Sequence, residues 1–204
     1  NTLEEVNGND WDCVMTIPEN QWGYHRDWSL TYVKTPYDLI EMTVKANSLD
    51  GNFVINFGPD GQGNIRSEET SIAKGVGDWM ALNGEAVYGV HHSALEKQDW
   101  GYSTQKGDNI YLTVFNKPMN NKIKVKVPKS KQKDMIFVIE EAGFLVSKQK
   151  AVITDGGRDK FGSYYYDILL PDKTVQKLKD PFVIKIKLKE VDKGDKGNYQ
   201  QAIT

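Results

Sequence analysis

Gly-Asn-Phe-Val-Ile-Asn-Phe-Gly-Pro, at residues 51–59, is the stretch that decides the fold of this chain. Its β-branched and aromatic residues, closed by Gly58-Pro59, are typical of a strand that is buried on both faces, as in a parallel sheet. A polar turn follows, and then a helix is expected. Ser67 is its predicted N-cap, acidic residues occupy its first turn, and Asn83-Gly84 ends it. The stretch therefore predicts one βα unit.

The residues before this unit predict a second one. Residues 11–17 are expected to form a strand, and a helix is expected from Pro36 to about Ser48, with proline at its first helical position. The loop between them, 18–32, is rich in aromatic residues, and loops on a rigid scaffold are where sites tend to lie. Two consecutive βα units indicate a parallel α/β fold. Two units cannot close a sheet that is covered on both faces, so we expect the chain to be part of a larger domain.

From residue 100 onward the pattern changes to short strands separated by turn residues. Such a pattern without helices predicts an antiparallel β-sandwich. A tail beginning at residue 193 has few apolar residues and is expected to be flexible. The strands are expected at 109–115, 122–127, 135–139, 143–146, 151–154, 164–169 and 182–188.

Charge is unevenly distributed along the chain. Residues 1–95 hold 5 Lys and Arg against 14 Asp and Glu, a net charge of −9, whereas residues 96–204 hold 21 against 14, a net charge of +7. A basic half can indicate nucleic-acid binding. Here the lysines alternate with Ile and Val, as at 122–127, which favours the solvent-facing side of strands, so no nucleic-acid partner is predicted.

Several other classes of protein are disfavoured by composition. No run of about eighteen apolar residues exists, so no membrane span is predicted. Cys13 is the single cysteine, which excludes an intrachain disulfide. His91-His92 has no Cys, His or acidic partner at ligand spacing, so we predict neither a metal site nor another cofactor. The chain begins without Met or a signal peptide, and we expect the natural protein to start further upstream.

Two ordered sets of motifs resemble the C-terminal portion of the α-L-fucosidases of glycoside hydrolase family 29. The first is Trp-Asp-Cys-Val-Met-Thr-Ile at 11–17 followed by Trp-Gly-Tyr at 22–24. The second is the 51–59 stretch followed by Gly77-Asp78-Trp79 and Asn-Gly-Glu-Ala-Val-Tyr at 83–88. The resemblance implies a TIM-type (β/α) barrel followed by an antiparallel β-sandwich. Residues 1–95 would be the last βα units of the catalytic barrel, 96–192 the sandwich, and 193–204 the flexible tail.

The resemblance also implies a chemistry. The family retains configuration: an Asp nucleophile attacks the anomeric carbon and a second carboxylic acid protonates the leaving oxygen. The nucleophile would lie upstream of this chain, so the chain alone is expected to be inactive. The acid/base in many members follows the Trp of the first motif, a position occupied here by Asp12. Because Asp is one methylene shorter than the usual Glu, Glu19 remains an alternative proton donor, and a purely structural role for Asp12 also stays open.

The same resemblance suggests how a sugar would be bound. Trp22 matches an aromatic residue that packs against the sugar ring, and Tyr24 and His25 could line the same pocket or only support it. The implied partners are a fucosylated oligosaccharide or glycoconjugate and the remainder of the barrel, and the implied location is outside the cytoplasm. A different function stays open, that of a non-catalytic carbohydrate-binding protein with a β-sandwich and a degenerate barrel remnant. An Asp facing Asp12 in the upstream sequence would separate the two.

Overall fold

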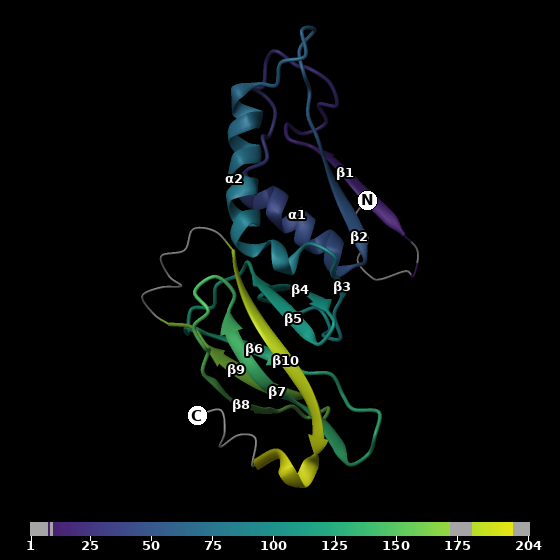
Figure 1. The fold of residues 1–204 in the computed structure, drawn as a ribbon, viewed down its shortest axis with the longest axis vertical. Helices are drawn as coiled ribbons and strands as arrows, with labels where there is room; N and C mark the ends of the chain where they lie inside the picture. The colour runs from purple at the N-terminus through teal and green to yellow at the C-terminus, as the bar shows by residue number, and fades with distance from the viewer. Residues whose placement is uncertain (1–7, 9, 172–180, 198–204) are drawn as a thin grey trace. The chain divides into compact units, whose positions relative to one another are not determined.

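The computed structural model describes residue 8 and residues 10–171 and 181–197 (Figure 1). It divides into two compact units, Asn1–Tyr88 and Gly89–Thr204, and each is described by itself. None of the described helices is both long and apolar enough to cross a bilayer.

The first unit contains two βα repeats. Strands β1 (Trp11–Thr16) and β2 (Gly51–Asn56) pair in parallel, with Trp11 opposite Gly51 and Thr16 opposite Asn56. Helix α1 (Pro36–Ser48) lies between them in sequence, and α2 (Ser67–Asn83) and the short η1 (Gly84–Ala86) follow β2. The order strand, loop, helix, strand, loop, helix is the one that the sequence predicts.

Local signals explain where the two helices begin. Thr35 caps α1 in a capping box: its hydroxyl accepts from the backbone N–H of Asp38, whose carboxylate accepts from the backbone N–H of Thr35. Burial of Asp38 raises the pKa of its carboxyl, but these hydrogen bonds and one from Tyr32 outweigh that effect and lower it. Ser67, expected to cap α2, is instead the first residue of that helix, which lacks a side-chain cap.

The prediction that the 51–59 strand is buried on both faces is wrong for this chain. Asn52 is exposed and Val54 is 44% exposed, as are their partners on β1, Asp12 and Val14 (42% exposed). The opposite side is covered by α1, whose Leu39, Ile40 and Val44 are buried. One face of the strand pair therefore has no covering layer among the described residues.

The second unit consists of two antiparallel sheets with one shared hydrophobic core (Figure 1). One sheet has the order β3-β4-β5-β10-β7, and the other has the order β6-β9-β8. Alternate residues of facing strands, such as Leu112, Ile184, Ile123 and Ile168, are buried in the core. The strands are β3 (His91–His92), β4 (Gly101–Lys106), β5 (Asn109–Val114), β6 (Lys122–Lys126), β7 (Met135–Phe144), β8 (Ile153–Arg158), β9 (Tyr164–Leu169) and β10 (Phe182–Asp192).

The second unit differs from the sequence-based expectation in several places. β3 and β4 were not expected, β4 because its Gly-Tyr-Ser-Thr-Gln-Lys sequence is mostly polar. The strand expected at 151–154 is β8, which begins at Ile153 and continues to Arg158. The strands predicted at 135–139 and 143–146 belong to one strand, β7, which contains a β-bulge. The tail expected to be flexible begins with a short helix, η2 (Lys193–Asp195), and its residues 198–204 lie outside the described part of the chain.

Candidate functional site

The aromatic loop predicted at 18–32 is anchored at its base and at the end of β2. At the base, the backbone N–H of Glu19 donates to the carbonyl of Tyr32 (2.8 Å). At the tip, the Asn56 side-chain amide donates to the carbonyl of Trp22 (3.0 Å). The backbone of Gly58 packs so closely on Gly23 that a Cβ at residue 58 would lie 2.6 Å from the carbonyl oxygen of residue 23. The loop therefore lies against the carboxyl end of β2, the end at which barrel enzymes carry their chemistry.

Arg66 holds the middle of the same loop. Its guanidinium donates to the carbonyls of His25 (3.1 Å) and Arg26 (3.0 Å), and it lies 4.2 Å from the ring centre of Trp28. Glu68 pairs with the guanidinium at 3.1 Å. Because the planar guanidinium can donate in several directions at once, one side chain fixes two peptide groups and an aromatic ring.

Replacing Arg66 is expected to loosen this loop. In Arg66→Gln, the loss of two charge-assisted hydrogen bonds and the stacked cation should favour local opening by about 1.5 kcal/mol. Limited trypsin digestion at Arg26, an exposed residue, should then become about tenfold faster. Lys74→Gln is the matched control, because Lys74 pairs only with Asp78 on the surface of α2. An unchanged rate at Arg26 would show that Arg66 does not hold the loop.

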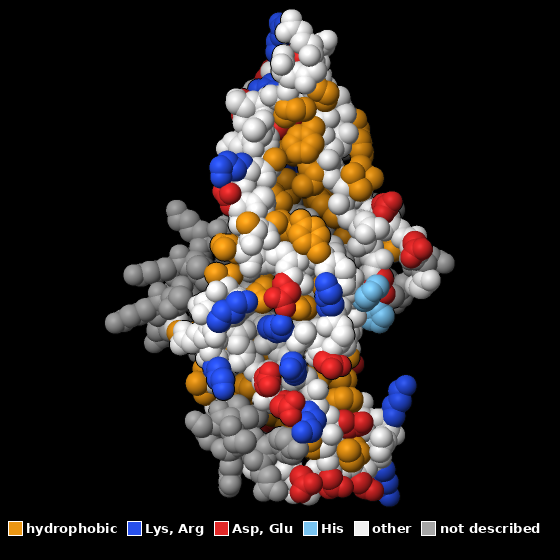
Figure 2. Space-filling model, in the orientation of Figure 1, with side chains coloured by type: hydrophobic (Ala, Val, Ile, Leu, Met, Phe, Trp, Pro, Cys, Tyr) orange, Lys and Arg blue, Asp and Glu red, His pale blue; other side chains and the backbone are white. Residues whose placement is uncertain are grey.

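Trp22, Tyr24 and His25 all lie on this loop and are exposed. Trp22 is 60% exposed and Tyr24 is 47% exposed. Nδ1 of His25 lies 2.6 Å from the carbonyl oxygen of Asp27, so Nδ1 carries the proton and Nε2 is the acceptor in the neutral ring. Figure 2 shows apolar and aromatic side chains gathered along the first unit. Aromatic rings and an imidazole are side chains suited to contacts with a sugar.

A short turn next to His25 carries a perturbed acid. The Asp27 carboxylate accepts a hydrogen bond from the backbone N–H of Ser29 (2.9 Å). This hydrogen bond holds the pKa of Asp27 below its ordinary value, so this group is a stable anion rather than a proton donor at neutral pH.

Asp12 lies away from the aromatic loop. It is exposed near the beginning of β1, and its carboxylate accepts from the side-chain amide of Asn52 (3.0 Å). Asn56, which holds Trp22, is four residues further along β2 than Asn52, or about 13 Å at about 3.3 Å per residue. The contact that positions the Asp12 side chain is thus with β2 and not with the aromatic loop.

Glu19 follows the carboxyl end of β1, but its carboxylate already has an ion-pair partner. Its carboxylate pairs at 2.5 Å with the ammonium of Lys34, whose side chain is only 2% exposed, whereas that of Glu19 is 49% exposed. A buried ammonium needs a partner, because an isolated buried charge is costly. Glu19 is thus the counter-ion of Lys34.

Sequence reasoning did not identify Arg66, Lys34 or Glu69 as parts of this site. Glu69 is 1% exposed and accepts from the backbone N–H of Gly58 (3.3 Å). Each of these residues acts over a long sequence distance, and no spacing pattern marks such contacts.

Among the described residues no group of three potential metal-ligating side chains occurs. The side-chain amides of Asn52 and Asn56 act as hydrogen-bond donors, to the Asp12 carboxylate and to the carbonyl of Trp22.

Comparisons with known proteins agree on one family. The family model described as alpha-L-fucosidase matches residues 1–85. Tissue alpha-L-fucosidase of Rattus norvegicus is 29% identical over 139 residues, which is 66% of this chain and 30% of that protein, and the Homo sapiens enzyme is 30% identical over 124 residues, or 58% and 26%. The chain thus spans about 30% of the curated relatives that it matches.

Solved structures give the same result over more of the chain. A family 29 alpha-L-fucosidase from Bacteroides thetaiotaomicron, trapped as a covalent intermediate with 2-fluoro-fucosyl fluoride, is 41% identical with a TM-score of 0.78. The match covers 88% of this chain and 38% of that one. By sequence and by structure, this chain is a relative of the family 29 α-L-fucosidases and matches a C-terminal portion of them.

Proposed function

We propose that this chain is part of a retaining exo-α-L-fucosidase that removes terminal α-L-fucose from glycans. The observation that carries the proposal is the match to fucosidases over both units, including 41% identity to an enzyme whose fucosyl intermediate was trapped. The chain would supply one wall of the sugar pocket. Trp22, exposed on a loop anchored at the carboxyl end of β2, would pack on the ring and C6 methyl of fucose, with Tyr24 and His25 beside it.

The first unit would be the last part of a (β/α) barrel, and the second unit a C-terminal β-sandwich. The parallel strand pair with helices on one side, and the exposed Val14 and Val54 on the other, support this view. Parallel strands are normally covered on both faces, so further strands of the complete protein would cover the exposed face.

Asp12 is the proposed acid/base, with Glu19 as the alternative. A retaining glycosidase places its two carboxyl groups about 5–5.5 Å apart, one on each side of the scissile bond. The Asp12 carboxylate is exposed and accepts a hydrogen bond from Asn52, whereas the Glu19 carboxylate already pairs with buried Lys34. We therefore propose that Asp12 protonates the leaving oxygen and that the nucleophile lies in the part of the complete enzyme outside this chain.

Asp12→Asn tests this proposal in the complete enzyme. We expect its turnover of substrates with poor leaving groups to fall on the order of a hundredfold or more, because these leaving groups need protonation. Azide should restore turnover of an activated aryl fucoside, since deglycosylation needs a general base. Turnover of both kinds of substrate within about threefold of wild type would show that Asp12 is not the acid/base.

Enzyme assays on the chain and on the complete protein test the proposed function itself. The complete protein should hydrolyse an aryl α-L-fucoside with retention of configuration, which proton NMR of the first-formed sugar detects. Residues 1–204 alone should not, because the nucleophile is missing. Enzyme-level turnover by the chain alone would contradict the assignment of the nucleophile, and an inactive complete protein that still binds fucose would favour the non-catalytic carbohydrate-binding function.

A further inference from the structure

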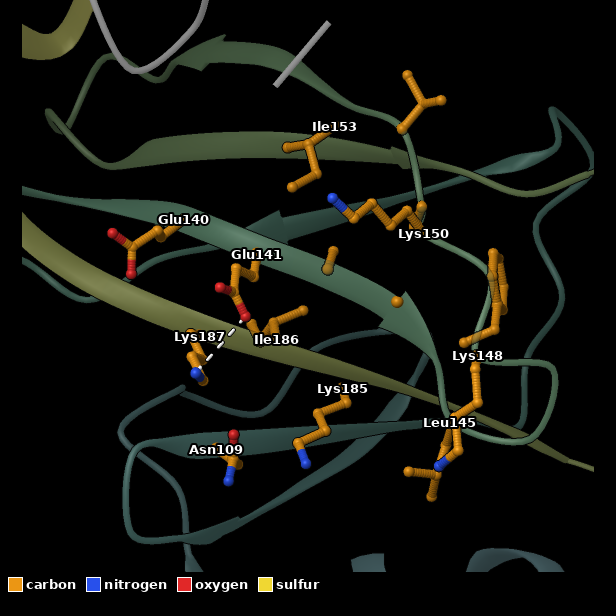
Figure 3. Close-up of a pocket in the computed structure, with 15 residues that line it drawn as sticks. Asn109, Glu140, Glu141, Leu145, Lys148, Lys150, Ile153, Lys185, Ile186 and Lys187 are labelled. Atoms are coloured by element: carbon orange, nitrogen blue, oxygen red, sulfur yellow. Dashed lines mark ion pairs between the residues drawn. The ribbon is translucent and has the colours of Figure 1, made fainter. Parts of the chain in front are cut away.

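A groove in the second unit has the size and lining of a ligand site (Figure 3). Its volume is about 610 Å³, within the range of about 300–1,000 Å³ that is common for ligand sites. It lies beside strands β7 and β10 and the turn that leads from β7 to β8. Part of its lining is apolar, with Phe144, Leu145 and Ala151.

A β-bulge turns two carboxylates toward this groove. Lys187 pairs in register with Glu141, whereas the next residue of β10, Leu188, pairs with Ile139, which leaves Glu140 as the extra residue. Adjacent residues of a regular strand point to opposite faces, but here Glu140 and Glu141 both line the groove. Bulges that re-aim side chains in this way are over-represented next to functional sites.

These carboxylates pair with lysines of β10. Lys187 pairs with Glu141 at 3.6 Å, and Lys189 pairs with Glu140 at 3.1 Å. Figure 3 shows Glu140, Glu141 and Lys187 at one side of the groove. The carboxylate oxygens are hydrogen-bond acceptors, which suits the hydroxyl groups of a sugar.

The other side of the groove presents positive charge. Figure 3 places Lys148 and Lys150 there, and their ammonium groups have no hydrogen-bond or ion-pair partner within the described part of the chain. Lys148 has a φ of +58°, in the left-handed region that is unfavourable for a non-glycine residue. That conformation turns the chain, and the backbone N–H of Lys148 donates to the carbonyl of Phe144 (2.9 Å).

We propose that the groove binds an anionic saccharide, whose sulfate or carboxylate group pairs with Lys148 or Lys150 and whose hydroxyl groups donate to Glu140 and Glu141. The choice of a saccharide rests on the proposed function, because a glycan processed by a fucosidase is the ligand that the second unit would meet. The site is separate from the aromatic loop of the first unit.

Binding to the complete protein tests this proposal by isothermal titration calorimetry. The probes are a sulfated fucose oligosaccharide, its desulfated counterpart, a carboxylated oligosaccharide and inorganic sulfate. Wild type should bind an anionic oligosaccharide at least tenfold more tightly than the desulfated one or inorganic sulfate, and the tighter of the two anionic probes identifies the charged group. Equal affinity for the desulfated oligosaccharide or for inorganic sulfate would overturn the proposal, as would no binding of either anionic oligosaccharide.

Two double variants locate the site. Lys148→Gln/Lys150→Gln should weaken binding of the anionic oligosaccharide about tenfold. Lys117→Gln/Lys131→Gln removes the same charge from exposed lysines outside the groove and should leave binding within about twofold. Equal weakening by both doubles would show diffuse attraction and overturn the site. Hydrolysis of an unsulfated aryl fucoside by the complete enzyme should be unchanged in the first double, so that a failure of the fucosidase proposal is seen separately.

Discussion

In the complete enzyme, Trp22→Ala should lower kcat/KM for α-L-fucosides about thirtyfold. The side chain is 60% exposed on its loop, so its removal leaves no cavity and should not unfold the protein. What is lost is apolar contact with the sugar, worth about 2 kcal/mol for a large aromatic ring. Steady-state kinetics measure the loss, and Trp22→Phe should recover most of it because a smaller ring still covers part of the sugar.

A remote aromatic residue provides the control for this variant. Phe161 in the second unit is 71% exposed, so Phe161→Ala removes a similarly exposed ring far along the sequence from the loop. Its kcat/KM should stay within about twofold of wild type. If Trp22→Ala were as active as Phe161→Ala, Trp22 would not contact the sugar, and the site proposed on this loop would have to be abandoned.

Glu19→Gln should destabilise the first unit by about 2 kcal/mol. The change leaves the ammonium of Lys34 buried without a counter-ion, a penalty of about 3–5 kcal/mol for a fully buried pair that is reduced here because Glu19 is half exposed. Lys34→Met should cost less than about 1 kcal/mol, because it removes the buried charge itself. Urea unfolding followed by tryptophan fluorescence suits the measurement, since Trp11, Trp22, Trp28 and Trp79 all lie in this unit.

The double variant Glu19→Gln/Lys34→Met separates the structural role of Glu19 from a catalytic one. With no ammonium to neutralise, the double should regain most of the stability lost in Glu19→Gln, and in the complete enzyme it should regain activity in parallel. A double that is stable but inactive, and that azide rescues on an activated substrate, would identify Glu19 as the proton donor and contradict our proposal.

The helices and strands of the first unit could be predicted because each is marked by a short stretch of its own sequence. The β-branched run at 51–56 and proline at position 36 lie where β2 and α1 begin. In the second unit the polar β4 was missed, since its burial depends on neighbouring strands rather than on its own composition. The pair Glu140-Glu141 interrupts the alternation of β7, so one bulged strand was predicted as two.

The site was less predictable than the fold. An aromatic loop with Trp22 could be recognised because its composition is unusual for a connector. The hydrogen bonds of Arg66 join residues about forty positions apart, and the ion pair of Lys34 with Glu19 depends on how the loop closes. Asp12 could be nominated from the family motif that begins at Trp11, but only the strand register shows that its partner is Asn52.

The uncovered strand pair of the first unit has a consequence for handling the isolated chain. β1 and β2 form a two-stranded parallel sheet, and within the described residues neither has a second strand along its other edge. Open edges beside exposed Val14 and Val54 are templates for pairing with another molecule. Residues 1–204 produced alone should therefore self-associate as concentration rises, and should stay monodisperse only when the missing strands are supplied in the same polypeptide or as a second fragment.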